Sequence, residues 1–460
     1  MVMRSPIEEV VLEGIRPKKK DIDHITTVAE RLVAAVDRSG IAEGMVVGSI
    51  ARHTWLNGDR DLDIFMLFDP SLPREDLEDK GLSLARSIAT EFGARYREKY
   101  AEHPYLNAQL EELDIDLVPC YRVPSAWEIQ SAVDRTPFHT RYISERINPL
   151  IDDVLLFKQF AKAGGFYGSD QMTEGFAGYL CELLVYYYGG FIPLIRAASS
   201  WKKRTIIDIE GIGAKSFEDS LVVIDPVDPN RNVAASVSLT RKFEFVELAR
   251  GYLSSPSAWF FTVIDEPPIT QDELRLILTQ RETALYGLFI RTPPFIPDIV
   301  VPQLRKSLGA IRGLLERHGF VVNRADCCMG DERCLMILEL LVDRLPQVRR
   351  HIGPPLWTEE NAGKFFSKER GAIFSGPYIE DGLYVVEIPR RYTDVASLLS
   401  SGEVLETGLG KHVKHSMREG WRVVRGADCW AEEFAPFLSR FLNRSSPLGR
   451  IRLREAQQNG

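Results

Sequence analysis

Residues 61–68 constrain the fold of this chain more than any other segment, because two aspartates lie within a run of apolar side chains. The segment reads DLDIFMLF and is followed by Asp69-Pro70, so it is predicted to be a buried strand that ends at a turn. Side chains two positions apart on a strand point to the same face, which places Asp61 and Asp63 together, both buried. Neighbouring carboxylates on an apolar strand cost free energy unless positive charge lies between them. The strand therefore predicts a site for a divalent cation, and Mg²⁺ prefers such oxygen ligands.

Two further segments belong with this strand. A short apolar strand at 45–47 leads into Gly48-Ser49, eleven residues before Asp61, and such a turn lets backbone N–H groups and a hydroxyl approach a triphosphate. The apolar strand predicted at 113–119 carries Asp114 and Asp116. One carboxylate from this strand would complete a two-metal site for in-line phosphoryl displacement. Spacing alone leaves Asp114 and Asp116 both open for that position.

The remaining pattern predicts an α+β chain of several parts. An amphipathic helix at 25–36, strands at 45–47, 61–68 and 113–119 and a charged helix over roughly 73–100 form a small α+β head. Residues 150–195 are strongly apolar and helical, and the segment 175–195, interrupted by a glutamate, is predicted to be a buried helix and not a membrane span. Beyond residue 270, helices crossing between strands indicate a split βαβ layer of the kind used by many RNA-binding modules. The elements expected there are a helix at 302–318, a strand-like segment at 319–322, an apolar segment at 334–343, a helix at 358–368 and a strand at 384–386.

Composition narrows the class of protein. A chain of 460 residues corresponds to about three domains at roughly 150 residues each. Its net charge of −8 disfavours indiscriminate coating of duplex nucleic acid, so a nucleic-acid partner would have to meet a local basic surface. The six scattered cysteines form no disulfide or zinc pattern, and the N-terminal residues contain no apolar run of a secretion signal. These features predict a cytoplasmic protein without a membrane partner.

The motifs, taken in order, resemble the DNA polymerase β-like nucleotidyltransferases and, more narrowly, the class I, archaeal-type CCA-adding tRNA nucleotidyltransferases. The resemblance covers most of the chain. It is carried by residues 48–56, 61–63, 116–121, 139–142, 175–184, 225–228, 231–235 and 351–355.

The resemblance implies a multidomain α+β architecture: a nucleotidyltransferase head with a mixed β-sheet, a helical neck that completes the nucleotide pocket, an RRM/ferredoxin-like α+β body that binds RNA, and a C-terminal tail that contacts tRNA. The corresponding ranges are 1–150, 151–265, 266–395 and 396–460.

It also implies site residues. Asp61, Asp63 and Asp116 would be the catalytic carboxylates that hold two Mg²⁺. Asp116 is preferred to Asp114 because it stands directly before the matching segment at 118–121. The family often has Glu at the position of Asp61. The nucleotide would be bound by Gly48, Ser49, Arg52, His139, Lys158, Tyr167 and Arg231, with Ser49 and Arg52 on the triphosphate and Arg231 on the base. Lys158 has an argument of its own, because an ammonium in the apolar segment 154–160 needs a phosphate, or must reach the surface.

The function implied is template-independent addition of CCA to the 3′ end of tRNA. The tRNA 3′-hydroxyl would attack the α-phosphate of CTP or ATP and release pyrophosphate, while the acceptor stem and TΨC arm are held by the body and tail. The family also suggests a homodimer. Two alternatives stay open: a related poly(A) polymerase or oligoadenylate synthetase, which shares the carboxylates, and a non-catalytic tRNA-binding scaffold.

Overall fold

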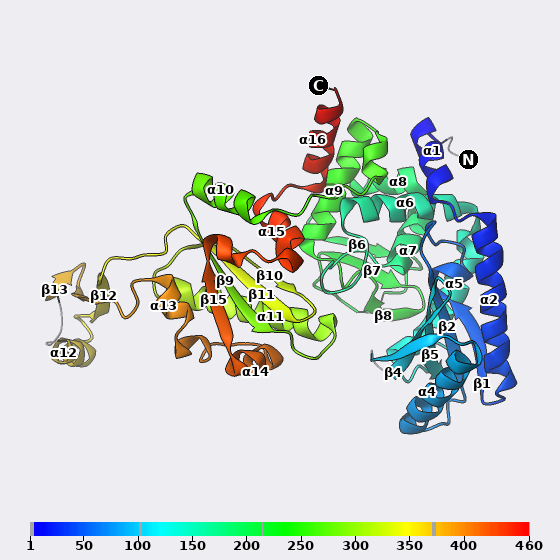
Figure 1. Ribbon diagram of the computed structural model, residues 1–460, viewed down its shortest axis with the longest axis horizontal. Coiled ribbons are helices and arrows are strands. Elements are labelled where there is room, and N and C mark those ends of the chain that lie inside the picture. Colours follow the sequence, from blue (N-terminus) through cyan, green and yellow to red (C-terminus); the bar gives the residue numbers. More distant parts are fainter. Residues whose placement is uncertain (1–3, 101–103, 214, 370–373, 460) are drawn as a thin grey trace. The chain divides into compact units, whose positions relative to one another are not determined.

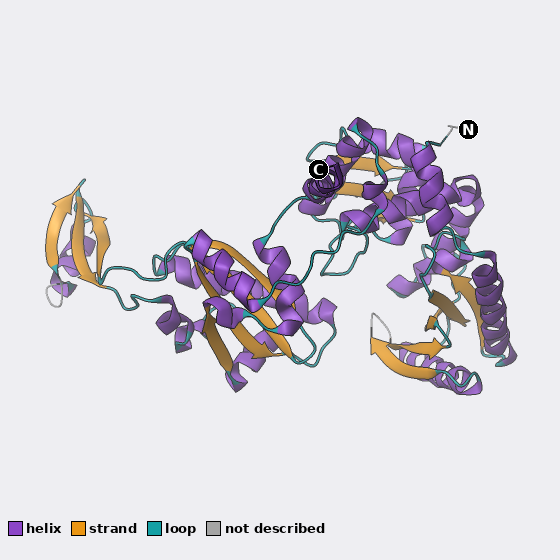
Figure 2. Ribbon diagram, turned by 45° about the horizontal axis from the view of Figure 1, so that its top comes forward, coloured by secondary structure: helices purple, strands orange, loops and turns teal. Residues whose placement is uncertain are grey.

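The computed structural model describes residues 4–100, 104–213, 215–369 and 374–459, and helices and strands are mixed throughout (Figures 1 and 2). The chain forms two compact units. Unit 1 comprises residues up to 264 together with those from 445 onward, and unit 2 comprises residues 265–444. The predicted multidomain α+β class is confirmed.

A mixed five-stranded sheet forms the first layer of unit 1. Its strands are β1 (Ala42–Val47), β2 (Asp61–Phe68), β3 (Arg95–Tyr100), β4 (Pro104–Leu110) and β5 (Leu113–Tyr121), in the order β1-β2-β5-β4-β3. Only the pair β2 and β5 is parallel. Helices α2 (Lys19–Arg38) and α4 (Arg74–Glu91) share an apolar core with Leu62 and Ile64 of β2 (Figure 1). Strand alternation therefore directs Asp61 and Asp63 to the opposite face of the sheet.

The charged helix predicted over 73–100 is confirmed up to Glu91 and is wrong beyond it. Helix α4 ends at Glu91, and Gly93 adopts a left-handed φ of +67°. Residues 95–100 then form the edge strand β3, which pairs with β4, and neither strand was predicted. An edge strand is rich in charge because one of its sides faces water, so its sequence shows no apolar run. Its backbone partner, and not its own composition, makes it a strand.

The second layer of unit 1 is mainly helical. An apolar and aromatic core joins α5 (Thr136–Ile147), α6 (Ile151–Gly164), α7 (Gly178–Tyr188), α8 (Phe191–Ala198) and α9 (Leu239–Ser254). A small sheet, β6-β7-β8, lies beside them, and α16 (Pro447–Asn459) packs against α9. The strands of that sheet are β6 (Thr205–Asp208), β7 (Leu221–Asp225) and β8 (Asp228–Asn232).

The apolar segment 175–195 does not form a single helix. Gly189 and Gly190 have φ values of +79° and +138°, and the chain turns there from α7 into α8 with a bend of 93°. Within the described part of the chain, no single helix is long and apolar enough to cross a membrane, although this bent pair together has the required length and composition.

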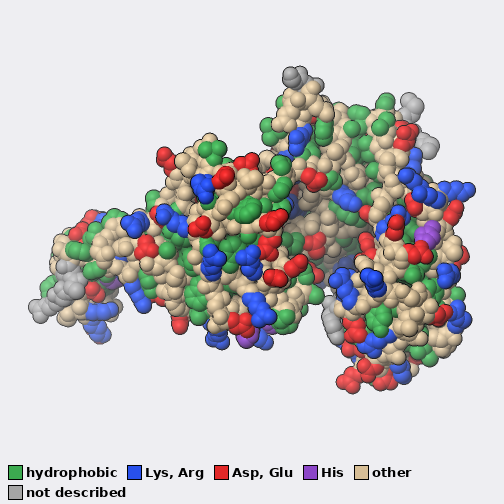
Figure 3. All heavy atoms as spheres, in the orientation of Figure 1, with side chains coloured by type: hydrophobic (Ala, Val, Ile, Leu, Met, Phe, Trp, Pro, Cys, Tyr) green, Lys and Arg blue, Asp and Glu red, His purple; other side chains and the backbone are tan. Residues whose placement is uncertain are grey.

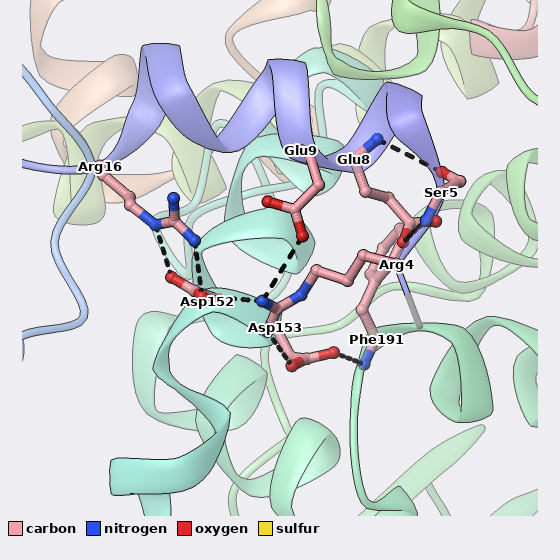
Figure 4. Close-up of polar contacts among 8 residues, drawn as sticks. All are labelled: Arg4, Ser5, Glu8, Glu9, Arg16, Asp152, Asp153 and Phe191. Atoms are coloured by element: carbon pink, nitrogen blue, oxygen red, sulfur yellow. Dashed lines mark hydrogen bonds and ion pairs between the residues drawn. The ribbon is translucent and has the colours of Figure 1, made fainter. Parts of the chain in front are cut away.

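The N-terminal helix α1 (Pro6–Ile15) is fastened to α6 by a cluster of ion pairs (Figure 4). Arg16 makes a bidentate contact with Asp152, at 2.8 and 2.7 Å, and Arg4 donates to the same carboxylate at 2.9 Å. Arg4 also donates to Asp153, whose other oxygen accepts from the backbone N–H of Phe191. The two aspartates at the start of α6 therefore tie together α1, α6 and α8.

We expect the substitution Asp152→Asn to lower the free energy of unfolding by about 2 kcal/mol, because hydrogen bonds to charged groups contribute about that much. Urea unfolding monitored by circular dichroism measures this change. Glu9→Gln is the matched control, since Glu9 faces the same Arg4 at 4.0 Å but is 53% exposed. Surface pairs of that kind contribute little, so the control should unfold at nearly the wild-type urea concentration. Equal losses in the two variants would contradict the prediction.

Unit 2 contains a four-stranded antiparallel sheet in the order β10-β11-β9-β15. Its strands are β9 (Ala284–Arg291), β10 (Val322–Met329), β11 (Arg333–Leu340) and β15 (Trp421–Arg425). Helix α11 (Pro297–Arg317) connects β9 to β10, and α14 (Lys411–Glu419) precedes β15. Strands β9 and β10 run parallel with β11 between them, which is the split βαβ arrangement of a ferredoxin-like fold.

Both faces of this sheet are covered. Helices α11, α13 (Val395–Leu399) and α14 share an apolar core with one face, and α10 (Gln271–Arg281) and α15 (Ala435–Leu442) share another core with the opposite face. A second module is inserted after β11. It consists of α12 (Glu359–Lys368) and the three-stranded sheet of β12 (Val348–Pro355), β14 (Leu383–Pro389) and β13 (Ser375–Glu380).

The structure groups the residues after 395 differently from the predicted tail. Strand β15 pairs with β9 and so belongs to the same sheet as residues 284–340. Residues from 445 onward belong to unit 1. Backbone pairing between distant segments decides this grouping.

Candidate active site

Four aspartates lie on one face of two neighbouring strands. In the parallel register of β2 and β5, Asp61 is paired with Asp114 and Asp63 with Asp116. Asp61 is exposed, which corrects the expectation that both aspartates of β2 are buried, whereas Asp63, Asp114 and Asp116 are half-buried. The sheet therefore concentrates negative charge at one place, as the spacing predicted.

Electrostatic repulsion within this group is strong. Burial, with the carboxylates of Asp116 and Asp61, raises the pKa of Asp63 to about 7. Partial desolvation of the Asp61 carboxyl and the charge of Asp114 raise the pKa of Asp61, and burial raises the pKa of Asp116. Each shift means that the ionised form is disfavoured. The site thus carries more negative charge than its own surroundings neutralise.

Asn107 on β4 connects the two aspartates of β5. Its side-chain Nδ2 donates to Asp116 Oδ1 at 2.7 Å and also contacts Asp114 Oδ1, and Asn107 itself is buried. This hydrogen bond opposes the rise in the pKa of Asp116. Asn107 could not be predicted as a site residue, because strand β4 was not predicted.

Gly48 brings the backbone close to Asp63. Val47, at the end of β1, is paired with Asp63, and Gly48 follows with a φ of +74°. A Cβ atom at Gly48 would lie 2.2 Å from Asp63 Oδ2, so only glycine leaves room for this carboxylate. Ser49 lies in the short helix α3 (Gly48–Ala51), next to the same strand end. The predicted turn and the predicted carboxylate are thus in contact.

Arg52 and Lys158 meet at one buried carboxylate, Glu182 on α7. Lys158 Nζ lies 3.2 Å from Glu182 Oε1, and Arg52 Nε lies 2.8 Å from Glu182 Oε2. Lys158 also donates to the backbone oxygen of Thr54 at 2.9 Å and to its hydroxyl at 3.2 Å. Burial alone would raise the pKa of Glu182, but Lys158 and Arg52 outweigh it and lower that pKa. The sequence predicted that the Lys158 ammonium needs a partner, and in the structure this partner is a carboxylate of the chain, Glu182.

Tyr167 lies beside Lys158 at the start of α7. A Cβ atom on Gly178, the first residue of that helix, would lie 3.3 Å from the Tyr167 hydroxyl and 3.6 Å from Lys158 Nζ. Tyr167 is on the loop after α6, where Gly165 has a φ of +76°. The two predicted nucleotide contacts are brought together, and the absent side chain of Gly178 gives them room.

His139 and Arg231 share a second buried carboxylate, Asp225 on β7. His139 Nε2 and Arg231 Nη1 each lie 2.8 Å from the same oxygen, Oδ2. The His139 ring stacks on Tyr179 with 4.2 Å between centroids. Burial lowers the pKa of His139, although Asp225 opposes that shift. The neutral imidazole is therefore favoured.

These side chains border a hollow of about 630 Å³ in unit 1. Arg231 is 38% exposed at its side chain, so part of its guanidinium faces outward. The lining of the hollow includes His139, Tyr179, Arg231, Arg135, Asp228 and Asn230. A planar base could be contacted here by an aromatic stack and by several hydrogen-bond donors and acceptors.

The structure thus places all ten predicted site residues in unit 1 and links them in groups. Arg52 joins the groups, because it also donates to Thr140 Oγ1 on α5 at 3.2 Å, next to His139. Three linking residues were missed from the sequence: Asn107, Glu182 and Asp225. Two of them carried a signal: Glu182 is a charged residue within an apolar helix, and Asp225 lies in the segment 225–228 that matches the family.

Comparison with known proteins finds matches over most of this chain. Three family models match in order: a nucleotidyltransferase domain at residues 29–160, the second domain of tRNA nucleotidyltransferase at 152–262, and the C-terminal domain of CCA-adding enzyme at 281–426. A CCA-adding enzyme of Methanoregula boonei is 58% identical over 449 residues, 97% of this chain and 98% of its own length. One of Methanosarcina mazei is 40% identical, over 94% of this chain and 97% of its own. Among solved structures, a cytoplasmic RNA terminal U-transferase matches 57% of this chain and 99% of its own, with a TM-score of 0.45 and 16% identity.

Proposed function

The chain belongs to the CCA-adding enzyme family of tRNA nucleotidyltransferases, and from this premise we propose how its residues divide the work. It adds CCA to the 3′ end of tRNA by nucleotidyl transfer. The observation that carries the proposal is the parallel register of β2 and β5, which gathers the carboxylates beside the Gly48 turn.

Asp61, Asp63 and Asp116 would hold Mg²⁺. Their donor set suits this ion, because it consists of carboxylate oxygens whose mutual repulsion a divalent cation would relieve. Within the described ranges, no three His, Cys, Asp or Glu side chains already form a metal-binding group. When bound, the ion would supply charge neutralisation at the reacting phosphate and at the 3′-hydroxyl. Asn107 would keep the Asp116 carboxylate oriented through the hydrogen bond from its side-chain amide.

Arg52, Ser49, Lys158 and Tyr167 would bind the triphosphate. Arg52 and Lys158 contact Glu182, and Tyr167 and Lys158 lie near Gly178 at the start of α7. Backbone N–H groups at the start of a helix also favour anions. His139 and Arg231 would contact the base, since the arginine presents a planar fork of donors and Asp225 fixes its direction. The template-independent choice of CTP or ATP would then rest on these groups and on the RNA end.

Unit 2 would hold the acceptor stem and TΨC arm of tRNA. Because helices cover both faces of its four-stranded sheet, bases cannot stack on the sheet itself, and contacts to backbone and groove shape are favoured. On the face shown in Figure 3, basic and acidic side chains are interspersed and do not gather into one basic patch. The homodimer and the cytoplasmic location stay predictions.

The test is extension of a tRNA transcript that lacks its 3′ CCA, followed on a denaturing gel with Mg²⁺. We expect two added residues with CTP alone, three with CTP and ATP, and none when EDTA replaces the ion. A long ladder with ATP alone would indicate a poly(A)-type polymerase. No extension, with the tRNA still retained in a filter-binding assay, would favour the non-catalytic scaffold.

A further inference from the structure

We propose that Glu182 is a positioning residue that sets the separation of Arg52 and Lys158, so that the cluster keeps a net positive charge and presents it to one triphosphate through Arg52. This inference rests on the proposed function and deepens it. Glu182 would touch neither substrate nor metal and would act through the two cations.

The location of Glu182 is costly for a carboxylate. Its side chain is completely buried on α7, and its neighbours Cys181, Leu183 and Leu184 are buried apolar residues. A charged group in such surroundings is retained only when it is paired, and an apolar residue of similar size would cost less. The helix therefore holds a carboxylate where its own packing does not need one.

The two oxygens of Glu182 divide the cations between them. Oε1 accepts from Lys158 at 3.2 Å and from the Thr54 hydroxyl at 2.5 Å, while Oε2 faces Arg52 at 2.8 Å. Because the two oxygens of a carboxylate are rigidly spaced, this arrangement fixes the two cations relative to each other. Without the negative charge, two buried cations would repel each other across the same space.

The contacts of Lys158 and Arg52 show which of their N–H groups can still donate to a phosphate. An ammonium has three N–H donors, and Lys158 directs them to Thr54 O, Thr54 Oγ1 and Glu182 Oε1. The contacts of Arg52 with Glu182 and Thr140 involve Nε and Nη1, and neither involves Nη2. The cluster as a whole has one negative and two positive groups. It therefore keeps a net positive charge for a phosphate, with Arg52 the more available cation.

The test compares the binding of CTP and CMP to wild type and to Glu182→Gln, by isothermal titration in the presence of Mg²⁺. Glutamine keeps the size and one acceptor oxygen, but it places an amide N–H group against Arg52. We expect CTP to bind about tenfold more weakly, because Arg52 loses the ion pair that positions it, whereas CMP affinity changes little. ATP should weaken by the same factor as CTP, because the triphosphate is common to both.

Two further variants separate positioning from stability. Glu8→Gln is the control, because Glu8 is also a buried carboxylate of unit 1, bonded to the Tyr252 hydroxyl at 2.9 Å, and it should leave the CMP-to-CTP ratio unchanged. Glu182→Asp keeps the charge on a shorter arm and should lose less CTP affinity than Glu182→Gln. If the glutamine variant does not fold, the aspartate variant carries the test, with a smaller loss confined to the triphosphate.

If substitutions of Glu182 leave the ratio of CTP affinity to CMP affinity unchanged, whether both affinities fall equally or neither falls, the positioning role is overturned. Failure of the proposed function would instead be seen in the wild-type protein, which would then neither bind CTP nor extend tRNA. The two failures are therefore distinguishable.

Discussion

The variant Asp63→Asn is expected to lose CCA addition by roughly 10³-fold or more, and at the same time to be more stable than wild type in EDTA. Activity falls because Asp63 is one of the three carboxylates proposed to hold Mg²⁺, and an amide oxygen is a weaker ligand for this ion. Stability rises because burial, Asp116 and Asp61 all disfavour its ionised form. An asparagine keeps the shape and removes the repulsion, so a gain of roughly 2–4 °C in Tm is expected for each kcal/mol relieved.

The pH dependence of this gain has a definite sign. The pKa of Asp63 is raised from 3.8 to about 7, so between these values the folded state binds more protons than the unfolded state. The free energy of unfolding contributed by this group therefore falls as the pH rises through that window. The advantage of Asp63→Asn should be full above pH 7 and should vanish near pH 4, as measured by thermal unfolding in EDTA across that range.

Asp69→Asn is the matched control for this experiment. Asp69 lies just beyond the other end of β2, is exposed, and accepts hydrogen bonds from Ser71 that lower its pKa. Removing its charge should give no gain in stability above pH 7 and should leave CCA addition unchanged. A Tm of Asp63→Asn at or below that of wild type at pH 8 would contradict the repulsion argument.

The central strand could be predicted from the sequence because its own residues determine it. The apolar run between Asp61 and Phe68 gives the observed bounds of β2, and the helix predicted at 302–318 corresponds to α11. The strand predicted at 319–322 reaches only the first residue of β10, the elements predicted at 358–368 and 384–386 belong to the inserted module, and β9 and β15 were not predicted. Strand β3 could not be predicted in this way. Its residues are charged, and its state depends on pairing with β4.

The linking residues of the site show a second limit. The apolar surroundings of Lys158 indicated that its ammonium needs a partner, but a phosphate and a carboxylate satisfy it equally in the sequence. Only the packing of α6 against α7 reveals Glu182. Asp225 was similarly hidden, because its contacts with His139 and Arg231 depend on how β7 meets α5 and β8. Patterns along the chain predict elements, and the pairing between elements requires the fold.

Gly48→Ala is expected to lower CCA addition by roughly 10²-fold without removing any charged or polar group, because displacement of a reacting group by about 1 Å can cost that much. The added Cβ would lie 2.2 Å from Asp63 Oδ2 and 3.3 Å from its Cγ, so the carboxylate must move. Because the backbone at position 48 is tied to β1, the side chain of Asp63 is the part that gives way. Single-turnover extension of tRNA with saturating CTP measures the loss.

Backbone strain has to be separated from this collision, and Gly40→Ala does so. Gly40 has a φ of +68°, close to the +74° of Gly48, and a Cβ there would meet nothing within 4 Å. Both variants carry the cost of a left-handed alanine, about 1–2 kcal/mol, and should therefore lose similar stability. Only Gly48→Ala should lose activity, because only there does the new methyl group enter the space of a carboxylate. Equal activity in the two variants would contradict the prediction, because it would mean that a side chain at position 48 does not displace the Asp63 carboxylate.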